Sequence, residues 1–230
     1  MTGANFQHAE MRLCCLRNAV VKDVIFVGAN LSEASLEGCD VGSANRDFSG
    51  ANLSKTSLLG LTMEGFSFAK AVLERVNLSR SVVRNCNLTE VNMRNTVLKG
   101  CVFEDVQMQK VDLVNSDLSG CVMRRCDLTE AKMDDCDLTE SVFQNCIMSG
   151  VSLLRSVLRA GDFSGCLLES AKLHHSDLTN CYFDDADMRG SGLDSVRADG
   201  VSMCNANLRG SVCRSASLQM STLRGADLTG

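Results

Sequence analysis

The chain of 230 residues has no proline and no tryptophan, and its only tyrosine is Tyr182. Proline lacks the backbone N–H that a β-ladder requires, so its absence favours a chain in which every residue takes part in a ladder. No apolar run approaches the about 18 residues of a membrane helix, and no charged-then-apolar leader follows Met1. We therefore expect neither a membrane span nor a secretion signal. The net charge of −5 is small and disfavours direct nucleic-acid binding.

What the sequence does contain is a five-residue period. An apolar or small residue recurs at every fifth position from Phe48 to Leu228, and a shorter tract from Phe6 to Val41 has the same spacing in another phase. Nearly every one of these repeat centres has a small residue two positions before it, as Ala51 stands before Leu53. Neither a helix of period 3.6 nor a strand of period 2 keeps such a pattern on one side, so the pattern indicates a stacked solenoid.

The repeat resembles the pentapeptide-repeat family, whose consensus is a small residue, Asp or Asn, Leu or Phe, a polar residue and a variable one. Residues 51–55 (ANLSK), 116–120 (SDLSG) and 226–230 (ADLTG) match it closely. The resemblance implies an all-β fold, a right-handed quadrilateral β-helix in which four repeats form one square coil of 20 residues. Over this chain it implies about eleven coils.

In such a fold residue n lies above residue n − 20 at about the 4.8 Å spacing of strands, and stability comes from stacked neighbours. The centres, including Leu128 and Leu138, are predicted to point inward. We expect one domain over residues 1–230, with a two-residue phase break between Val41 and Phe48. Arg46 occupies an inward slot beside this break, and we expect it to turn outward because a buried charge is costly.

Most of the thirteen cysteines occupy the small inward slot, where a free thiol behaves as a small hydrophobe. Stacked cysteines such as Cys126 and Cys146 have parallel side chains, which suit a disulfide poorly. The spacing contains no Cys-x-x-Cys pair and no paired histidines, so we predict reduced core thiols and no metal site. Cys204 stands in an outward slot and is expected to react first.

One outward ladder of residues spaced by 20 is apolar. We interpret it as a candidate interaction stripe, interrupted by Asp162: Val82, Val102, Val122, Val142 and Tyr182. The neighbouring ladder alternates in charge, from Glu64 through Arg84 and Glu104 to Arg124. Two interpretations remain open: β-branched residues that suit a strand-like wall, or a face for a partner or a second copy.

A second candidate surface is acidic. The segment 112–140 holds a cluster of aspartates: Asp112, Asp117, Asp127, Asp134, Asp135 and Asp137. Much of this cluster follows from the preference of the repeat for Asp before Leu. The alternative is an acidic patch for a basic partner.

The sequence offers little for catalysis. The only Ser, His and Asp grouping has His174 and His175 beneath Asp194 and Ser195, and it lacks an oxyanion hole and a strained nucleophile turn. We therefore predict no catalytic residue, no cofactor-binding residue and no cofactor.

The resulting hypothesis is a non-enzymatic, cytoplasmic scaffold that binds a protein partner or forms a homodimer, either alone or as a module of a larger chain. The resembled family also includes bacterial effectors that leave the cell by non-classical routes. The alternative is the quinolone-resistance type of the family, which imitates DNA and binds a type II topoisomerase. This sequence lacks the C-terminal dimerising helix and the wall loops of that type, and its acidity is modest.

Overall fold

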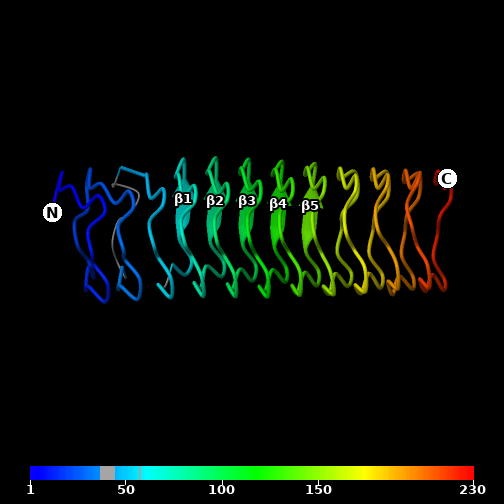
Figure 1. The fold of residues 1–230 in the computed structure, drawn as a ribbon, viewed down its shortest axis with the longest axis horizontal. Helices are drawn as coiled ribbons and strands as arrows, with labels where there is room; N and C mark the ends of the chain where they lie inside the picture. The colour runs from blue at the N-terminus through cyan, green and yellow to red at the C-terminus, as the bar shows by residue number, and fades with distance from the viewer. Residues whose placement is uncertain (37–44, 57) are drawn as a thin grey trace.

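A computed structural model describes residues 1–36, 45–56 and 58–230, and these residues wind into a rod-like stack of coils (Figure 1). Parallel bridges join residue n to residue n + 20, from Asp47↔Ser67 to Asn207↔Asp227. Bridges recur every five residues, so each coil has the four sides of the predicted square. The described residues form no helix. The all-β solenoid is therefore confirmed.

One side of the rod is extended enough to form regular strands. They are β1 (Thr62–Glu64), β2 (Val82–Arg84), β3 (Val102–Glu104), β4 (Val122–Arg124) and β5 (Val142–Gln144). They form one parallel sheet in chain order, with each strand one coil after the last. We call this side the strand wall. The side that precedes it in each coil carries a bridged series that we call the aspartate wall: Val97, Asp117, Asp137, Val157 and Asp177.

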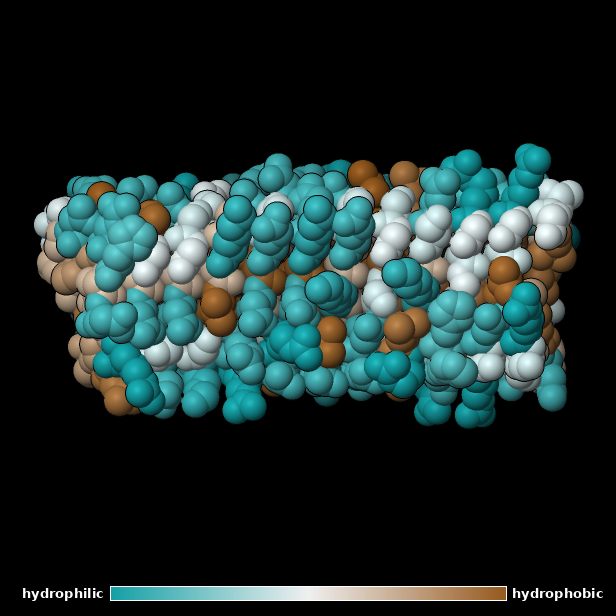
Figure 2. All heavy atoms as spheres, in the orientation of Figure 1, coloured by the Kyte–Doolittle hydropathy of each residue, from teal (hydrophilic) through white to brown (hydrophobic). Residues whose placement is uncertain are grey.

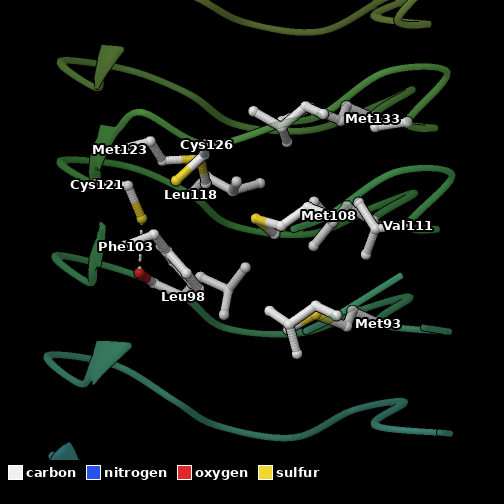
Figure 3. Packing of buried hydrophobic residues seen from close by; sticks show 14 of the residues in the cluster. Met93, Leu98, Phe103, Met108, Val111, Leu118, Cys121, Met123, Cys126 and Met133 are labelled. Carbon is white, nitrogen blue, oxygen red and sulfur yellow. Dashed lines mark hydrogen bonds between the residues drawn. The ribbon is translucent and has the colours of Figure 1, made fainter. Parts of the chain in front are cut away.

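The interior is filled by the repeat centres and the small residues two positions before them. Leu128 and Leu138 are both 0% exposed, so their predicted inward orientation is confirmed. Figure 3 shows neighbouring centres such as Met93 and Phe103 projecting into the space between the walls. Burial of each such side chain stabilises the fold by roughly 1.5–3 kcal/mol. The backbone closes the stack, as where Leu128 N–H donates to Ile147 O at 2.7 Å.

Aromatic rings stack along the interior at two places. Phe26 and Phe48 lie 5.3 Å apart between centroids, and Phe143, Phe163 and Phe183 are separated by 4.8 and 5.1 Å. Gly161 makes room for the second stack, because a Cβ there would lie 2.8 Å from a ring carbon of Phe163. The glycine in a slot that usually holds a larger residue is thus explained by the large centre beside it.

The phase break leaves the ladder in register. Asn30 bridges to Asn52, an offset of 22 residues, whereas Asn52 bridges to Val72 with the usual 20. Two extra residues are therefore absorbed within one coil. Arg46 is exposed and has φ 49°, so the predicted outward turn is confirmed, while residues 41–44 lie outside the described residues.

Candidate interaction surfaces

The predicted apolar stripe is a real ladder on the strand wall. Val82, Val102, Val122 and Val142 pair directly in the sheet register, and all four are half-buried. Each stands one residue before a buried centre, so its side chain projects from the outer face of a strand. These four residues are hereafter the valine ladder.

The fifth member of the stripe is separate. Asp162 bridges Val142 to Tyr182 and interrupts the apolar surface, and Tyr182 is 51% exposed. The strands also stop at β5, so Tyr182 lies beyond the strand wall proper.

The charges beside the valine ladder pair with one another along the rod. Glu104 accepts from Arg84 at 3.1 Å and from Arg125 at 2.8 Å, and Arg125 also binds Asp105 at 2.7 Å. The hydrogen bonds from Arg125 hold the pKa of both Glu104 and Asp105 below its ordinary value. Arg124 donates to Gln144 at 2.9 Å. The wall is thus flanked by charges that are largely neutralised, which lowers the electrostatic cost of covering it.

The six aspartates of the predicted acidic patch do not form one surface. Asp117 and Asp137 bridge each other on the aspartate wall, but Asp112 and Asp127 lie on two other walls, where they bridge to Lys132 and Ile147. Because these three walls face in different directions, Asp112, Asp127 and the Asp117–Asp137 pair cannot all contact one partner surface.

Several of these carboxylates are also occupied within the chain. Asp112 pairs with Arg94 at 3.1 Å and Asp135 with Arg155 at 2.6 Å, while Asp134 accepts the backbone N–H of Leu154 at 3.0 Å.

Those that stand one residue before a centre accept the backbone N–H two residues on. Asp117 accepts from Ser119 and Asp137 from Thr139, both at 2.9 Å, and Asp127 accepts from Thr129 at 3.0 Å. This is the Asx-turn geometry that Asp and Asn favour, and it explains why the repeat prefers Asp there.

Two surface features escaped the sequence interpretation. Ile147 and Leu167 bridge each other on the wall that follows the strand wall, and they are 40% and 46% exposed. They are a second, smaller apolar pair. The signal was their shared slot one residue before a centre and their spacing of 20.

The second feature is a shallow groove of about 1020 Å³ along the corner between the aspartate wall and the strand wall. Its lining is made chiefly of turn residues from five successive coils: Leu59, Gly60, Ser79, Arg80, Lys99, Gly100, Ser119, Gly120, Asp137, Thr139 and Glu140. A Cβ added at Gly60 or Gly120 would meet nothing within 4 Å, so missing side chains hollow this corner. The glycine spacing was visible in the sequence, but the corner that collects it was not.

The histidine grouping has a structural explanation. His174 Nδ1 lies 3.6 Å from Asp194 Oδ2, and the His174 ring covers Gly192, whose added Cβ would come within 2.4 Å of His174 Cε1. Gly192 is therefore the residue that admits the ring. Among the described residues, no three or more His, Cys, Asp or Glu side chains gather as a metal site would require.

The thiols follow the prediction for the inward slots but not for Cys204. The eight buried cysteines of the described residues are free thiols, and Cys121 donates to Leu98 O at 2.9 Å (Figure 3). Burial raises the pKa of Cys136, Cys166 and Cys181 to about 12.

The expectation that Cys204 reacts first rested on an outward, water-facing position, and the structure does not give it the greatest exposure among the described thiols. Cys204 is half-buried, whereas Cys15 and Cys213 are exposed. Asp184 accepts the Cys204 backbone N–H at 2.7 Å, and Ser202 Oγ lies 3.6 Å from the Cys204 sulfur, so neighbours partly cover it.

Comparison with known proteins agrees with this architecture. The model of the pentapeptide repeat region matches residues 121–193, and that of pentapeptide repeats (8 copies) matches residues 14–45, 47–85, 86–125 and 193–230. The chain therefore belongs to the pentapeptide-repeat family. No curated protein matches it in sequence.

A solved structure shares the fold. Trypsin-treated QnrB1, a plasmid-mediated fluoroquinolone resistance protein, has a TM-score of 0.65 at 15% identity, covering 77% of this chain and 89% of that one. HetL from the cyanobacterium Nostoc sp. strain PCC 7120, involved in heterocyst differentiation regulation, has a TM-score of 0.37 at 20% identity, covering 98% and 90%. Within the described part of this chain, no helix could span a membrane.

Proposed function

We propose that the chain is a non-enzymatic protein-interaction scaffold and that the strand wall is its contact surface. The observation that carries the proposal is the valine ladder, four β-branched side chains in register on the one regular sheet of the rod. Contiguous apolar surface on a soluble protein often marks a contact site. The rod has the shape of a scaffold, and its function resides in such surfaces rather than in the fold itself.

The surface around the ladder supports the same proposal. Figure 2 shows that the visible face of the rod is mainly hydrophilic, with hydrophobic side chains scattered between rows of polar ones. On the strand wall the neighbouring charges are paired with each other, through Arg84, Glu104 and Arg125. A partner that covers the valines therefore does not have to desolvate unpaired charges at the same time.

The proposal is tested with the double variant V102K/V122K. Both side chains project outward and are half-buried, so the fold is expected to survive with a loss of less than about 1 kcal/mol per site. Two lysines in the middle of the ladder should weaken binding of a tagged copy to untagged copies and to co-purifying proteins. The readouts are pull-down yield and sedimentation velocity.

The matched control is I147K/L167K, which places two lysines one coil apart on an adjacent wall. Association that is lost only in the valine variant supports the strand wall. Association that is lost only in the control variant moves the contact to Ile147 and Leu167 and overturns the proposal.

The DNA-mimicking alternative is less well supported by the geometry. Such a mimic needs a continuous acidic surface, but the six aspartates are spread over several walls, and Arg94 and Arg155 neutralise two of them. The likeness to QnrB1 is one of fold. Gyrase inhibition by the purified protein that is unchanged in V102K/V122K but lost in D117K/D137K would favour this alternative.

A further inference from the structure

The corner groove divides its charges between its two ends. Arg80 and Lys99 lie toward the earlier coils, while Asp137 and Glu140 lie at the later end, with Asp117 beside them on the aspartate wall. In the described part of the chain, these five side chains take part in no ion pair, although Arg84, Arg125 and Arg155 on nearby corners all do. The groove therefore has a basic end and an acidic end.

These charges cannot neutralise each other within one chain. Arg80 and Glu140 occupy the same turn position three coils apart, and at the inter-strand spacing this is about 14 Å. Asp117 and Asp137 stack on successive coils, where like charges repel. Cations at one end and anions at the other would all be paired by a surface with the opposite polarity.

The same groove in reverse is such a surface. We propose that this corner pairs with the same corner of a second copy, with the two rods antiparallel and a two-fold axis between the coils of Gly100 and Gly120. In an isologous interface of this kind, a contact of residue i with residue j of the other chain is matched by the contact of j with i. Arg80 of each chain then lies opposite the Glu140 of the other chain, and Lys99 opposite its Asp117.

The glycines at the centre permit the close approach. On either side of the axis Gly100 of one copy faces Gly120 of the other, and neither presents a side chain. Gly100 has φ 65° and Gly120 φ 64°, but the backbone does not demand glycine, because Lys110 and Glu140 occupy the same turn position at φ 57° and 58°. The absence of side chains at this corner is thus not required by the turn, and it leaves room for a partner.

The interface is continuous with the proposed contact wall. Val102 and Val122 follow Gly100 and Gly120 by two residues, in the same coils, so they border the groove. The inference rests on the proposed function and deepens it, by naming a second copy of this chain as the partner. Salt should weaken the pairing, because exposed charges contribute to it.

The charge arrangement gives a reciprocal test with the full chain. R80E places a carboxylate at both position 80 and position 140, and E140R places a guanidinium at both. Each variant alone should dimerise about tenfold or more weakly than the wild type, because like charges then face each other. An equimolar mixture of the two should regain association, since the carboxylates at positions 80 and 140 of one chain then face the guanidinium groups at positions 140 and 80 of the other. Sedimentation velocity measures all three samples.

The double variant R80E/E140R restores the polarity within one chain and should self-associate like the wild type. Loss of association in the single variants with recovery in both the mixture and the double variant supports the proposal. A mixture that associates no better than its components overturns it, as does a wild type that stays monomeric at high concentration.

A second variant tests the contact without altering the charges at the ends. G120N adds a side chain beside the two-fold axis, and Asn180 occupies the same turn position at φ 58°, so the monomer should fold. We expect G120N to weaken the dimer while its melting curve remains cooperative. Unchanged dimerisation of G120N contradicts the proposed pairing. If V102K/V122K weakens association and the charge variants do not, the strand wall remains the contact surface and only this pairing fails.

Discussion

The aspartate wall and the strand wall carry the same five-residue repeat but differ in backbone form after each repeat centre. On the aspartate wall the chain turns tightly after each centre, with Asp117 accepting from Ser119 N–H and Cys121 N–H donating to Leu118 O at 3.1 Å. On the strand wall the residues around Met123 stay extended and pair only with neighbouring coils. The comparison shows that one five-residue repeat builds both a tight and an extended wall, since Val97 and Val157 also precede centres on the aspartate wall.

The turn bond that follows each centre overlaps in length between alanine and valine in the small inward slot. With alanine it ranges from 2.8 Å (Ala71 N to Phe68 O) to 3.4 Å (Ala216 N to Cys213 O), and with valine from 3.1 Å to 3.4 Å. At the start of the strand wall this slot holds Phe66, whose N–H contacts Cys86 Sγ at 3.4 Å instead. On the later strands the same slot holds Cys86, Val106, Cys126 and Cys146, so the extended form does not depend on a large side chain there.

At Asp162 the column of the valine ladder changes from extended strand to tight turn. Asp162 lies one coil after Val142 and accepts Ser164 N–H at 3.0 Å, and a turn bond of 3.2 Å from Cys166 N to Phe163 O follows it. An Asx-turn competes with the strand for the same backbone groups. The valine ladder thus ends where an aspartate first occupies its column.

The largest expected effect tests what the two walls share. Leu138→Asp places a carboxylate in the interior behind the aspartate wall, and Leu128→Asp does so behind the opposite wall. An unpaired buried charge should lower the free energy of unfolding by about 4 kcal/mol or more in each case. Thermal and denaturant melts followed by circular dichroism measure it. The outward control Lys132→Asp should change stability by less than about 1 kcal/mol; melts of both leucine variants that match this control would contradict the inward assignment.

The next effect probes the boundary between the two forms of wall. Asp162→Val removes the acceptor of Ser164 N–H and should cost about 1 kcal/mol. We also expect the extended form to continue past β5, with the Cys166 N to Phe163 O turn bond opening. A crystal structure of the variant that retains this bond would show that the column residue does not control the wall.

A pH titration separates the walls electrostatically. Hydrogen bonds from Arg125 lower the pKa of Glu104 and Asp105 on the strand wall. Because these folded-state values lie below the unfolded ones, the stabilisation is present above the ordinary carboxyl range and is lost as the pH falls through the folded values. Arg125→Gln should raise both pKa values in a carboxyl-detected NMR titration. Titration curves identical to those of the wild type would show that this pairing does not form in solution.

The smallest expected effect is a difference in the labelling rates of the cysteines. Cys121 lies behind the strand wall and Cys136 behind the aspartate wall, and both are buried. We expect these two thiols to react slowly and alike with a thiol reagent in the native state, and Cys15 to react far sooner. Peptide mass spectrometry after timed labelling measures the order. Early labelling of Cys136 with protection of Cys121 would indicate that the aspartate wall opens locally.

The sequence predicts the repeated part of this structure well, because each inward slot is dictated by volume and each coil copies the last. Leu128 and Leu138 point inward, and Arg46 turns outward, for reasons of burial that need no coordinates. The surfaces are harder to predict. The six aspartates are near in sequence but belong to different walls, and Arg94 and Arg155 reach them from other coils. Cys204 is partly covered by Asp184 and Ser202, one coil before it and two residues before it, which the slot pattern does not encode.

The most direct test of the account is methyl NMR of the valines at increasing protein concentration. Val102 and Val122 lie on the strand wall, whereas Val72 belongs to a different, bridged column and serves as an internal reference. We predict that the methyl signals of Val102 and Val122 shift as the concentration rises while those of Val72 stay constant. Shifts confined to Val72, or no shift at any of the three, would contradict the assignment of the strand wall as the contact surface.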